Sequence, residues 1–168
     1  AAGHMSKLIL RGAHLRGVPL GTASMVEADL AGASGTGEFR KRFPDRFLDI
    51  GLCEQDMIGT AAGMALAGKC IFITTHGMLA AGKAWDIIRS TICYGALNVN
   101  ICGADAGLSA GAAGGSRQSL EDVAVMRTLP GMTVIVPADA TEARLAVRAA
   151  AEHEGVPGTV PESQGDST

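Results

Sequence analysis

Short apolar runs alternate along the chain with longer segments of small and apolar residues. The short runs are typical of buried strands, and they cover residues 24–28, 70–75, 98–103 and 133–136. The longer segments predict helices over residues 54–67, 80–93, 118–128 and 139–153. Strands that alternate with helices at this spacing imply right-handed crossovers and a parallel sheet covered on both faces. We therefore expect an α/β fold of three layers, in which ligands bind at the carboxyl ends of the strands.

The two ends of the chain differ in composition from its centre. Ala1-Ala2-Gly3-His4 before Met5 has the character of an expression-tag remnant, and residues 156–168 have the composition of a flexible linker. We therefore expect one domain over residues 5–155. Its last predicted helix follows Asp139-Ala140-Thr141-Glu142, which is a good N-terminal cap.

Composition limits the partners of the chain. Its 168 residues suit one domain with a real core; 47% are hydrophobic, 18% are charged and 23 are glycine. A formal net charge of −3 gives no basic stripe, so we do not expect nucleic acid as a partner. No run approaches the roughly 18 apolar residues of a membrane span, and no signal peptide is visible. We expect a cytoplasmic protein with buried free thiols at Cys53, Cys70, Cys93 and Cys102.

Glu54 stands where a short extended stretch, residues 46–51, gives way to the first predicted helix. An acid in a first helical turn complements the helix dipole by roughly 0.3–1 kcal/mol, and this structural role is one interpretation of Glu54. The other is that its carboxyl group does chemistry. Burial against the small apolar residues of the helix then raises its pKa, as a proton donor near neutral pH requires.

A series of motifs resembles, in collinear order, the pyrimidine-binding domain of transketolases, especially the C-terminal subunit of split bacterial transketolases. The resemblance runs from about Glu27 to about Gly155 and implies the thiamine diphosphate-binding fold of the pyrimidine-binding type. It rests on Glu27-Ala28-Asp29-Leu30, Phe43-Pro44-Asp45-Arg46-Phe47-Leu48-Asp49-Ile50-Gly51, Glu54-Gln55-Asp56-Met57, Ala84-Trp85-Asp86-Ile87-Ile88-Arg89, Gln118-Ser119-Leu120-Glu121-Asp122 and residues 126–139.

In that family, the glutamate that matches Glu54 hydrogen-bonds N1′ of the aminopyrimidine of thiamine diphosphate. Protonation of this nitrogen favours the tautomer whose exocyclic nitrogen removes the C2 proton of the thiazolium, and the cofactor carries the carbanion chemistry. The resemblance thus implies that Glu54 is catalytic. It also implies cofactor contacts from Asp29, Leu30, Glu54, His76 and Leu79.

A thiamine diphosphate site also needs a second domain, which holds the diphosphate through a divalent cation with ligands suited to magnesium. The sequence lacks the Gly-Asp-Gly and paired-asparagine motif of that domain, and Gly165-Asp166 lies in the predicted tail. The last strand and the C-terminal domain usual in the family are not recognisable either. We therefore expect no metal ligands in this chain, a separate diphosphate-binding subunit of the N-terminal transketolase type, and no activity of this chain alone.

The wall of the cofactor site departs from the family pattern. His76 stands where the family has a phenylalanine that stacks on the aminopyrimidine, and Leu79 falls near the next ring-contact position. Because an imidazole can stack, one interpretation keeps His76 in the cofactor site. In the other, His76 lies at the start of a helix and bonds to the backbone.

The substrate loop, residues 105–118, differs from the family pattern more than the cofactor site does. In transketolases it reads Gly-Glu-Asp-Gly and ends in Thr-His-Gln, with another histidine upstream, and these side chains contact sugar hydroxyls or the phosphate end. Here those places carry Ala112-Ala113, Arg117 and Asp105. Each lost hydrogen bond typically costs about 1–3 kcal/mol, which argues against an ordinary sugar-phosphate substrate. Asp105, Arg117 and Gln118 are the candidate substrate-binding residues.

The same loop resembles, more loosely, that of the beta subunit of pyruvate dehydrogenase E1, through Ser109-Ala110-Gly111 and Ser116-Arg117-Gln118. The planar fork of Arg117 suits an anionic donor or the phosphopantetheine phosphate of a carrier protein. A solvated surface arginine is the alternative interpretation.

Three hypotheses for function follow. The first is a pyrimidine-binding subunit of a two-component thiamine enzyme that transfers a two-carbon ketol or acyl unit. The second is a dehydrogenase-type beta subunit that passes an acyl unit to a lipoyl or acyl-carrier partner. The third is a non-catalytic structural or regulatory partner. From the resemblance we expect a homodimer that binds two diphosphate-binding subunits, with the helix after Glu54 near the two-fold axis and with Gly59, Ala62, Gly63, Ala65 and Ala67 on the contact surface.

Overall fold

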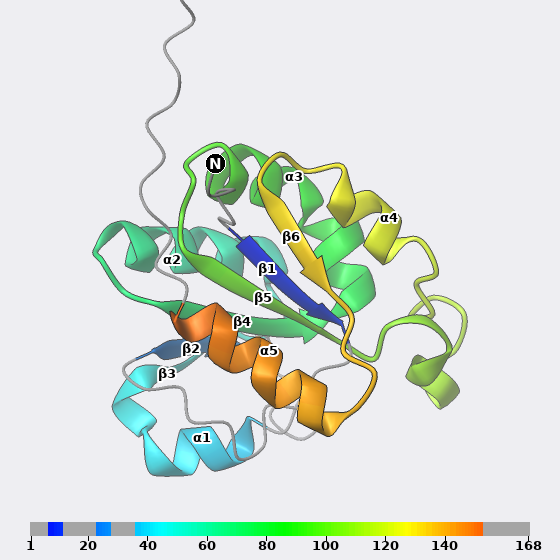
Figure 1. The fold of residues 1–168 in the computed structure, drawn as a ribbon, viewed down its shortest axis with the longest axis horizontal. Helices are drawn as coiled ribbons and strands as arrows, with labels where there is room; N and C mark the ends of the chain where they lie inside the picture. The colour runs from blue at the N-terminus through cyan, green and yellow to red at the C-terminus, as the bar shows by residue number, and fades with distance from the viewer. Residues whose placement is uncertain (1–6, 12–22, 28–35, 153–168) are drawn as a thin grey trace, which may run out of the picture.

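A six-stranded parallel sheet forms the centre of the chain (Figure 1). The computed structural model describes residues 7–11, 23–27 and 36–152. The strands lie in the order β3-β2-β4-β5-β1-β6, and every neighbouring pair is parallel. They are β1 (Lys7–Arg11), β2 (Ser24–Glu27), β3 (Phe47–Asp49), β4 (Ile71–His76), β5 (Val99–Ala104) and β6 (Met132–Ile135).

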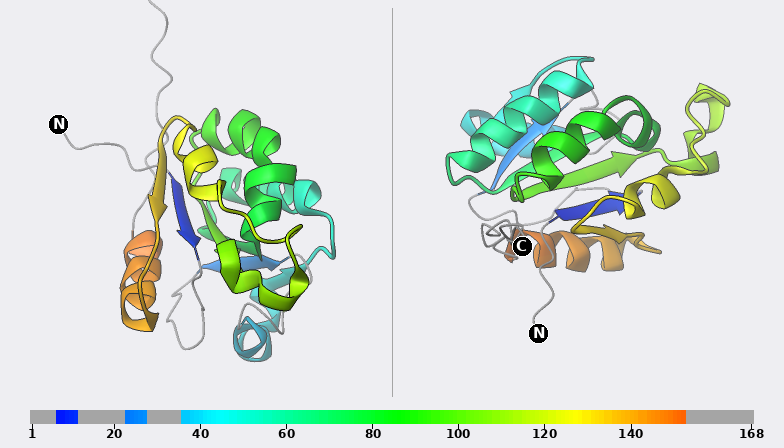
Figure 2. Two further views of the ribbon diagram at one scale, coloured as in Figure 1. Left: turned by 90° about the vertical axis from the view of Figure 1, so that its right-hand side faces the viewer. Right: turned by 90° about the horizontal axis from the view of Figure 1, so that it is seen from above.

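The sheet lies between two layers of helices (Figure 2). On one face, α2, the helical turns that follow β4, and α4 bury the larger hydrophobic cluster. On the other face, α5 covers a second cluster, to which α1 contributes Phe39. The predicted three-layer α/β fold is confirmed. The helices are α1 (Gly37–Arg42), η1 (Pro44–Arg46), α2 (Glu54–Leu66), η2 (Leu79–Lys83), α3 (Trp85–Ile87), η3 (Ile88–Cys93), η4 (Gly107–Ala113), α4 (Asp122–Arg127) and α5 (Ala140–Glu152).

The central strands β4 and β5 are covered on both faces, which explains why their sequences are almost continuously apolar. Successive side chains of β4 point to opposite sides of the sheet. Ile71 and Ile73 enter the cluster under α2, and Phe72 enters the cluster under α5. In β5, Ile101 likewise enters the cluster under α2, and Cys102 enters the cluster under α5. Packing on both faces holds the two strands in position, and it therefore also holds their carboxyl ends in position.

The four predicted strands correspond to β2, β4, β5 and β6, and the predicted extended stretch contains β3. Strand β1 was not predicted; it lies between β5 and β6 and pairs with both. Its short apolar run, Leu8-Ile9-Leu10, was the available signal. The missed strand completes the sheet, because without it β5 and β6 would not be joined.

The helix predicted over residues 80–93 is interrupted. Two π-helical turns, η2 and η3, flank the three residues of α3. In each turn an amide reaches back five residues: Ala84 N–H donates to Leu79 O at 2.9 Å, and Tyr94 N–H donates to Arg89 O at 3.0 Å. Such turns are rare and are often found at functional sites. The helix predicted over residues 118–128 is also shorter, since α4 begins at Asp122.

All four cysteines have free thiols, but they differ in exposure. Cys102 is buried, and burial raises the pKa of its thiol to about 12. Cys70 and Cys93 are half-buried, whereas Cys53 is exposed immediately before α2. The prediction of a buried thiol is therefore wrong for Cys53, because the chain reaches α2 across the surface. Within the described ranges, no helix is long and apolar enough to cross a bilayer.

Candidate functional site

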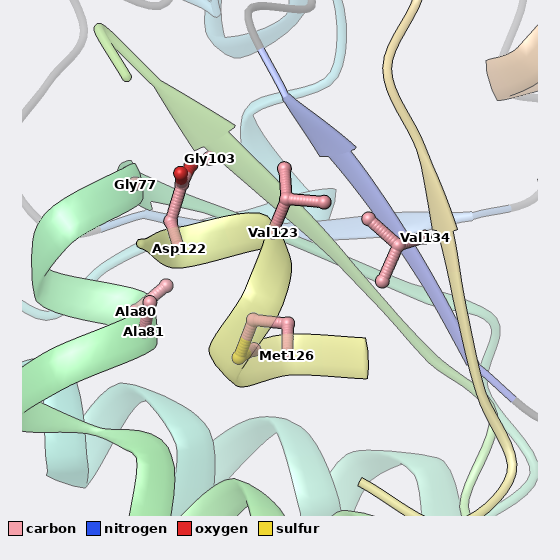
Figure 3. A pocket seen from close by; sticks show the side chains of 8 residues that line it. All are labelled: Gly77, Ala80, Ala81, Gly103, Asp122, Val123, Met126 and Val134. Atoms are coloured by element: carbon pink, nitrogen blue, oxygen red, sulfur yellow. The ribbon is translucent and has the colours of Figure 1, made fainter. Parts of the chain in front are cut away.

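The carboxyl ends of β4 and β5 meet at one edge of the sheet, where His76 pairs with Ala104. The backbones approach closely just beyond this pair. A Cβ atom built on Gly77 would lie 2.9 Å from Ala106 Cβ and 3.4 Å from an Asp122 carboxylate oxygen, and one on Gly103 would lie 3.1 Å from Gly77 Cα. Figure 3 shows Asp122 of α4 beside these two glycines. The glycines therefore allow the loop after β5 and the turn after β4 to lie against each other.

His76 and Asp105 are brought together by this arrangement. His76 Nδ1 lies 3.4 Å from Asp105 Oδ2, and the two side chains are 19% and 34% exposed. His76 Nδ1 has no partner of good hydrogen-bond geometry. Its contact with Asp105 is an ion pair only in the state in which the imidazole is protonated. Asp105 has φ +47°, a left-handed conformation that aspartate adopts more readily than most residues. The neighbour of Nδ1 is thus the Asp105 carboxylate.

Glu54 is the first residue of α2 and is only 2% exposed. Its Oε2 accepts a hydrogen bond of 2.6 Å from Lys83 Nζ, and the Lys83 side chain is 50% exposed. Gln55 continues the contact, because its Nε2 donates to the carbonyl oxygen of Lys83 at 3.2 Å. The start of α2 is thus attached to the end of η2 by two side-chain contacts.

The pKa of Glu54 was predicted to be raised, and this prediction is wrong: its pKa is lowered overall. Burial does raise the pKa, and it is the largest single influence. It is outweighed by the hydrogen bond from Lys83, the backbone N–H of Glu54 itself, and the positive charges of Lys83 and Arg117, so that the pKa lies below 4.5. The apolar neighbours are evident in the sequence, but the contact with the lysine is not. Glu54 is therefore a carboxylate near neutral pH.

An open cleft of about 490 Å³ lies at the start of α2. Its volume is within the usual range for small-molecule sites. Leu52, Cys53, Glu54, Gln55, Asp56, Gly59, Lys83 and Ile87 line it. A second cavity, between α4 and the ends of β4 and β5, holds about 10 Å³ (Figure 3). That space is enough for about one water molecule, so of these two spaces only the cleft beside Glu54 is large enough for an organic ligand.

The loop over residues 105–118 contains a run of 3₁₀ turns, η4, and then approaches α4. Arg117 and Gln118 are half-buried at its end. The Gln118 amide donates to the carbonyl oxygen of Gly111 at 3.4 Å, and the charge of Arg117 acts on Glu54. The structure therefore groups the predicted residues in two sets: Glu54 with Arg117, and His76 with Asp105.

Two of the predicted cofactor residues, Asp29 and Leu30, lie outside the described residues. Leu79 is half-buried at the start of η2, three residues after His76. Lys83 was not among the predicted site residues. The available signal was its position as the lone charged residue between His76 and Asp86.

The described residues fit the pyrimidine half of a thiamine diphosphate site. They provide a buried carboxylate at the mouth of a cleft, and the small side chains of Ala80 and Ala81 are packed beneath the turn that follows β4. Among these residues, no group of three His, Cys, Asp or Glu side chains gathers in a way that would hold a metal ion.

Comparison with known proteins gives consistent similarities. The family model for the transketolase pyrimidine binding domain matches residues 21–164. A putative transketolase C-terminal section of Methanocaldococcus jannaschii is 44% identical over 131 residues, which are 78% of this chain and 42% of that protein. A 6-deoxy-6-sulfo-D-fructose transketolase subunit of Clostridium sp. is 38% identical over 130 residues, 77% of this chain and 40% of that protein.

Among solved structures, a split gene transketolase described as an inactive beta4 tetramer matches with a TM-score of 0.69 and 46% identity. The match covers 80% of this chain and 43% of that one. An apulose-4-phosphate transketolase component of Phocaeicola vulgatus is 35% identical, over 73% of this chain and 39% of its own length. The chain thus spans about two fifths of the length of these relatives, at 42%, 40% and 39%.

Proposed function

This chain belongs to the transketolase family through its pyrimidine-binding domain, and from that premise we propose that it is the pyrimidine-binding subunit of a two-component, thiamine diphosphate-dependent enzyme. The enzyme transfers a two-carbon ketol or acyl unit. Glu54 activates the aminopyrimidine of the cofactor. The similarity to C-terminal subunits of split transketolases supports the division of the enzyme between two chains.

The observation that carries this proposal is the position of Glu54. Its carboxyl group is 2% exposed, begins α2, and borders a cleft of about 490 Å³. An exposed acid in a first helical turn also stabilises the helix dipole, so that role does not require burial. A buried carboxylate is costly unless it is paired, and here a pair holds it at the mouth of a ligand-sized space. This arrangement suits an acid that exchanges a proton with a ring nitrogen.

When bound, thiamine diphosphate supplies the electron sink for carbon–carbon bond cleavage. The proposed tasks of this chain are to hold the pyrimidine half and to exclude water from it. Glu54 hydrogen-bonds the ring nitrogen, and His76 and Leu79 form the wall on which the ring lies. Asp29 and Leu30 are proposed to contact the cofactor as well. The diphosphate and its Mg²⁺ are proposed to be held by a separate subunit of the N-terminal transketolase type.

The substrate is proposed to carry an anionic group. Arg117 is half-buried, and its charge acts on Glu54, so the guanidinium lies where it influences the reacting end of the site. Two relatives are named for a sulfo-sugar and for a sugar phosphate, both of which are anionic. Asp105 and Gln118 are proposed as further substrate contacts. The weak similarity of the loop to the beta subunit of pyruvate dehydrogenase E1 keeps an α-keto acid, with a lipoyl or acyl-carrier acceptor, as the alternative.

The functional unit is proposed to be a homodimer that binds two diphosphate-binding subunits as a heterotetramer. Gly59, Gly63 and Leu66 form an exposed stripe along α2, and Leu66 is 74% exposed. Apolar side chains exposed to this degree beside a small-residue stripe suit a contact between helices. Ala62, which was expected on this surface, is instead 2% exposed in the core.

The test is titration of thiamine diphosphate with Mg²⁺ into the chain mixed with its diphosphate-binding subunit, followed by turnover of a ketose phosphate and of an α-keto acid. We expect Glu54→Gln to lower turnover by at least about 100-fold, the usual contribution of a positioned proton donor. Glu38→Gln, an exposed acid on α1, is the matched control and should not change turnover. Absence of cofactor binding by the assembled complex would support the third hypothesis, a non-catalytic partner.

A further inference from the structure

Lys83 is held twice by the first two residues of α2. Its ammonium donates to Glu54 Oε2 at 2.6 Å, and its carbonyl oxygen accepts from Gln55 Nε2 at 3.2 Å. The ammonium contact reaches a carboxylate that is 2% exposed, although the lysine side chain itself is 50% exposed. A surface ion pair between two mobile side chains contributes little, but here one partner is fixed by burial.

Lys83 is also the last residue of η2, the turn that starts with Leu79. This turn follows His76 at the end of β4 and is closed by the hydrogen bond from Ala84 N–H to Leu79 O. The segment that carries both proposed wall residues is therefore attached at its far end to Glu54. A displacement of Lys83 would move the acid relative to the wall.

We propose that Lys83 is a positioning residue for Glu54: its ammonium fixes one carboxylate oxygen and supplies the positive charge beside it until the pyrimidine nitrogen of the cofactor binds. This inference rests on the proposed function and adds a residue that the family motifs do not supply. Lys83 touches the acid and not the reacting atoms, so its role is to prepare Glu54.

Cofactor binding is then accompanied by uptake of a proton. Because Glu54 is ionised before binding, the proton shared between its carboxylate and the ring nitrogen comes from solvent, and cofactor binding takes up about one proton near neutral pH. Loss of the Lys83 ammonium removes two of the influences that lower the pKa of Glu54, so the acid carries more of this proton beforehand. Arg117 also lowers this pKa, and Asp56 lines the same cleft. Both remain in a Lys83 variant, so the change is partial.

The direct test is a ¹³C NMR titration of the carboxyl groups in the glutamate-labelled chain, with the Glu54 signal assigned from Glu54→Gln. In the wild type we expect a titration midpoint below 4.5. In Lys83→Met the midpoint should be higher than in the wild type, and Lys83→Arg should restore the low midpoint. Lys69→Met removes an exposed lysine beyond the other end of α2 and should change nothing. Equal midpoints in the wild type and Lys83→Met would overturn the proposal.

The second measurement concerns cofactor binding. Calorimetric titration of thiamine diphosphate with Mg²⁺ into the assembled two-subunit complex, in two buffers of different ionisation enthalpy, gives the number of protons taken up. At a pH between the two NMR midpoints, we expect uptake that is smaller in Lys83→Met and restored in Lys83→Arg; equal uptake in all three proteins at that pH contradicts the proposal. If the NMR midpoints shift as expected but Glu54→Gln binds cofactor and turns over like the wild type, the proposed function fails while the control of Glu54 ionisation by Lys83 stands.

Discussion

His76 Nδ1 lies 3.4 Å from Asp105 Oδ2, so a residue of the proposed cofactor wall contacts a residue of the proposed substrate loop. His76 is the last residue of β4 and Asp105 directly follows β5, the neighbouring parallel strand, and the ends of these strands are held together by close glycine packing. An imidazole in contact with a carboxylate is constrained in how it can turn toward a ring. The contact therefore links the orientation of the wall to the conformation of the loop.

The first prediction follows from this contact. His76→Phe removes the attraction to Asp105 and provides a larger aromatic face, so we expect thiamine diphosphate to bind the assembled complex more tightly. Ring stacking contributes about 0.5–1.5 kcal/mol, which corresponds to roughly two- to tenfold in the dissociation constant. Calorimetric titration of the assembled complex measures this dissociation constant. His76→Ala should weaken binding, and weaker binding by both variants would show that the wild-type imidazole is needed for a polar contact.

The second prediction concerns acid stability. The pKa of Glu54 is lowered in the folded chain, since the bonds and charges from Lys83, the backbone and Arg117 outweigh burial. A lowered folded-state pKa stabilises the fold above the unfolded value and loses this contribution as pH falls through the folded value. Urea unfolding should therefore show stability falling below about pH 4.5, with a smaller fall in Glu54→Gln. Equal pH dependence in the two proteins would contradict the prediction.

Apolar periodicity was sufficient to predict the layers of the fold, because β4 and β5 are buried on both faces and α2 and α5 are long. It was not sufficient for β1, a five-residue strand whose identity depends on pairing with β5 and β6, which lie about 90 and 125 residues later. The π-helical turns η2 and η3 were missed for a related reason. Their wider hydrogen-bond spacing leaves little signal in a pattern of small apolar residues.

The position of Glu54 was predictable from the change between an extended stretch and an apolar helix, but its ionisation was not. Its lowered pKa depends on Lys83, which lies 29 residues away and on another element. The contact between His76 and Asp105 likewise joins the last residue of β4 to the residue that follows β5. Sequence spacing identified the candidate residues for chemistry, whereas the partners that set their charge state came from the tertiary structure.

The third prediction tests the cap of α5. Asp139 Oδ1 accepts hydrogen bonds of 2.8 Å from the amides of Thr141 and Glu142, and Glu142 Oε2 accepts one of 2.6 Å from the amide of Ala138. The predicted N-terminal cap is thus confirmed. Asp139→Ala should lower the free energy of unfolding by about 1 kcal/mol, measured by urea unfolding. Asp139→Asn keeps an acceptor oxygen and should lose much less; an equal loss would mean that charge rather than capping is responsible.

The fourth prediction concerns the exposed stripe on α2. A Cβ atom built on Gly59 or Gly63 meets nothing within 4 Å, so a larger side chain fits on the isolated chain. Gly63→Leu should leave the fold intact, and replacing a helical glycine should stabilise it by up to about 1 kcal/mol. If two copies pack through this stripe, the same leucine separates their helices and shifts the chain from dimer to monomer in size-exclusion chromatography with light scattering.

The matched control for that prediction is Ala149→Leu, which enlarges an exposed small residue of α5 on the opposite face of the sheet. It should leave the oligomeric state unchanged. Because helices that approach through glycine lie close together, one leucine on the contact face is enough to prevent their packing, whereas position 149 is exposed on α5 among the described residues. A Gly63→Leu chain that stays dimeric at micromolar concentration would place the contact elsewhere, while a wild-type chain that is monomeric would remove the homodimer from the proposed assembly.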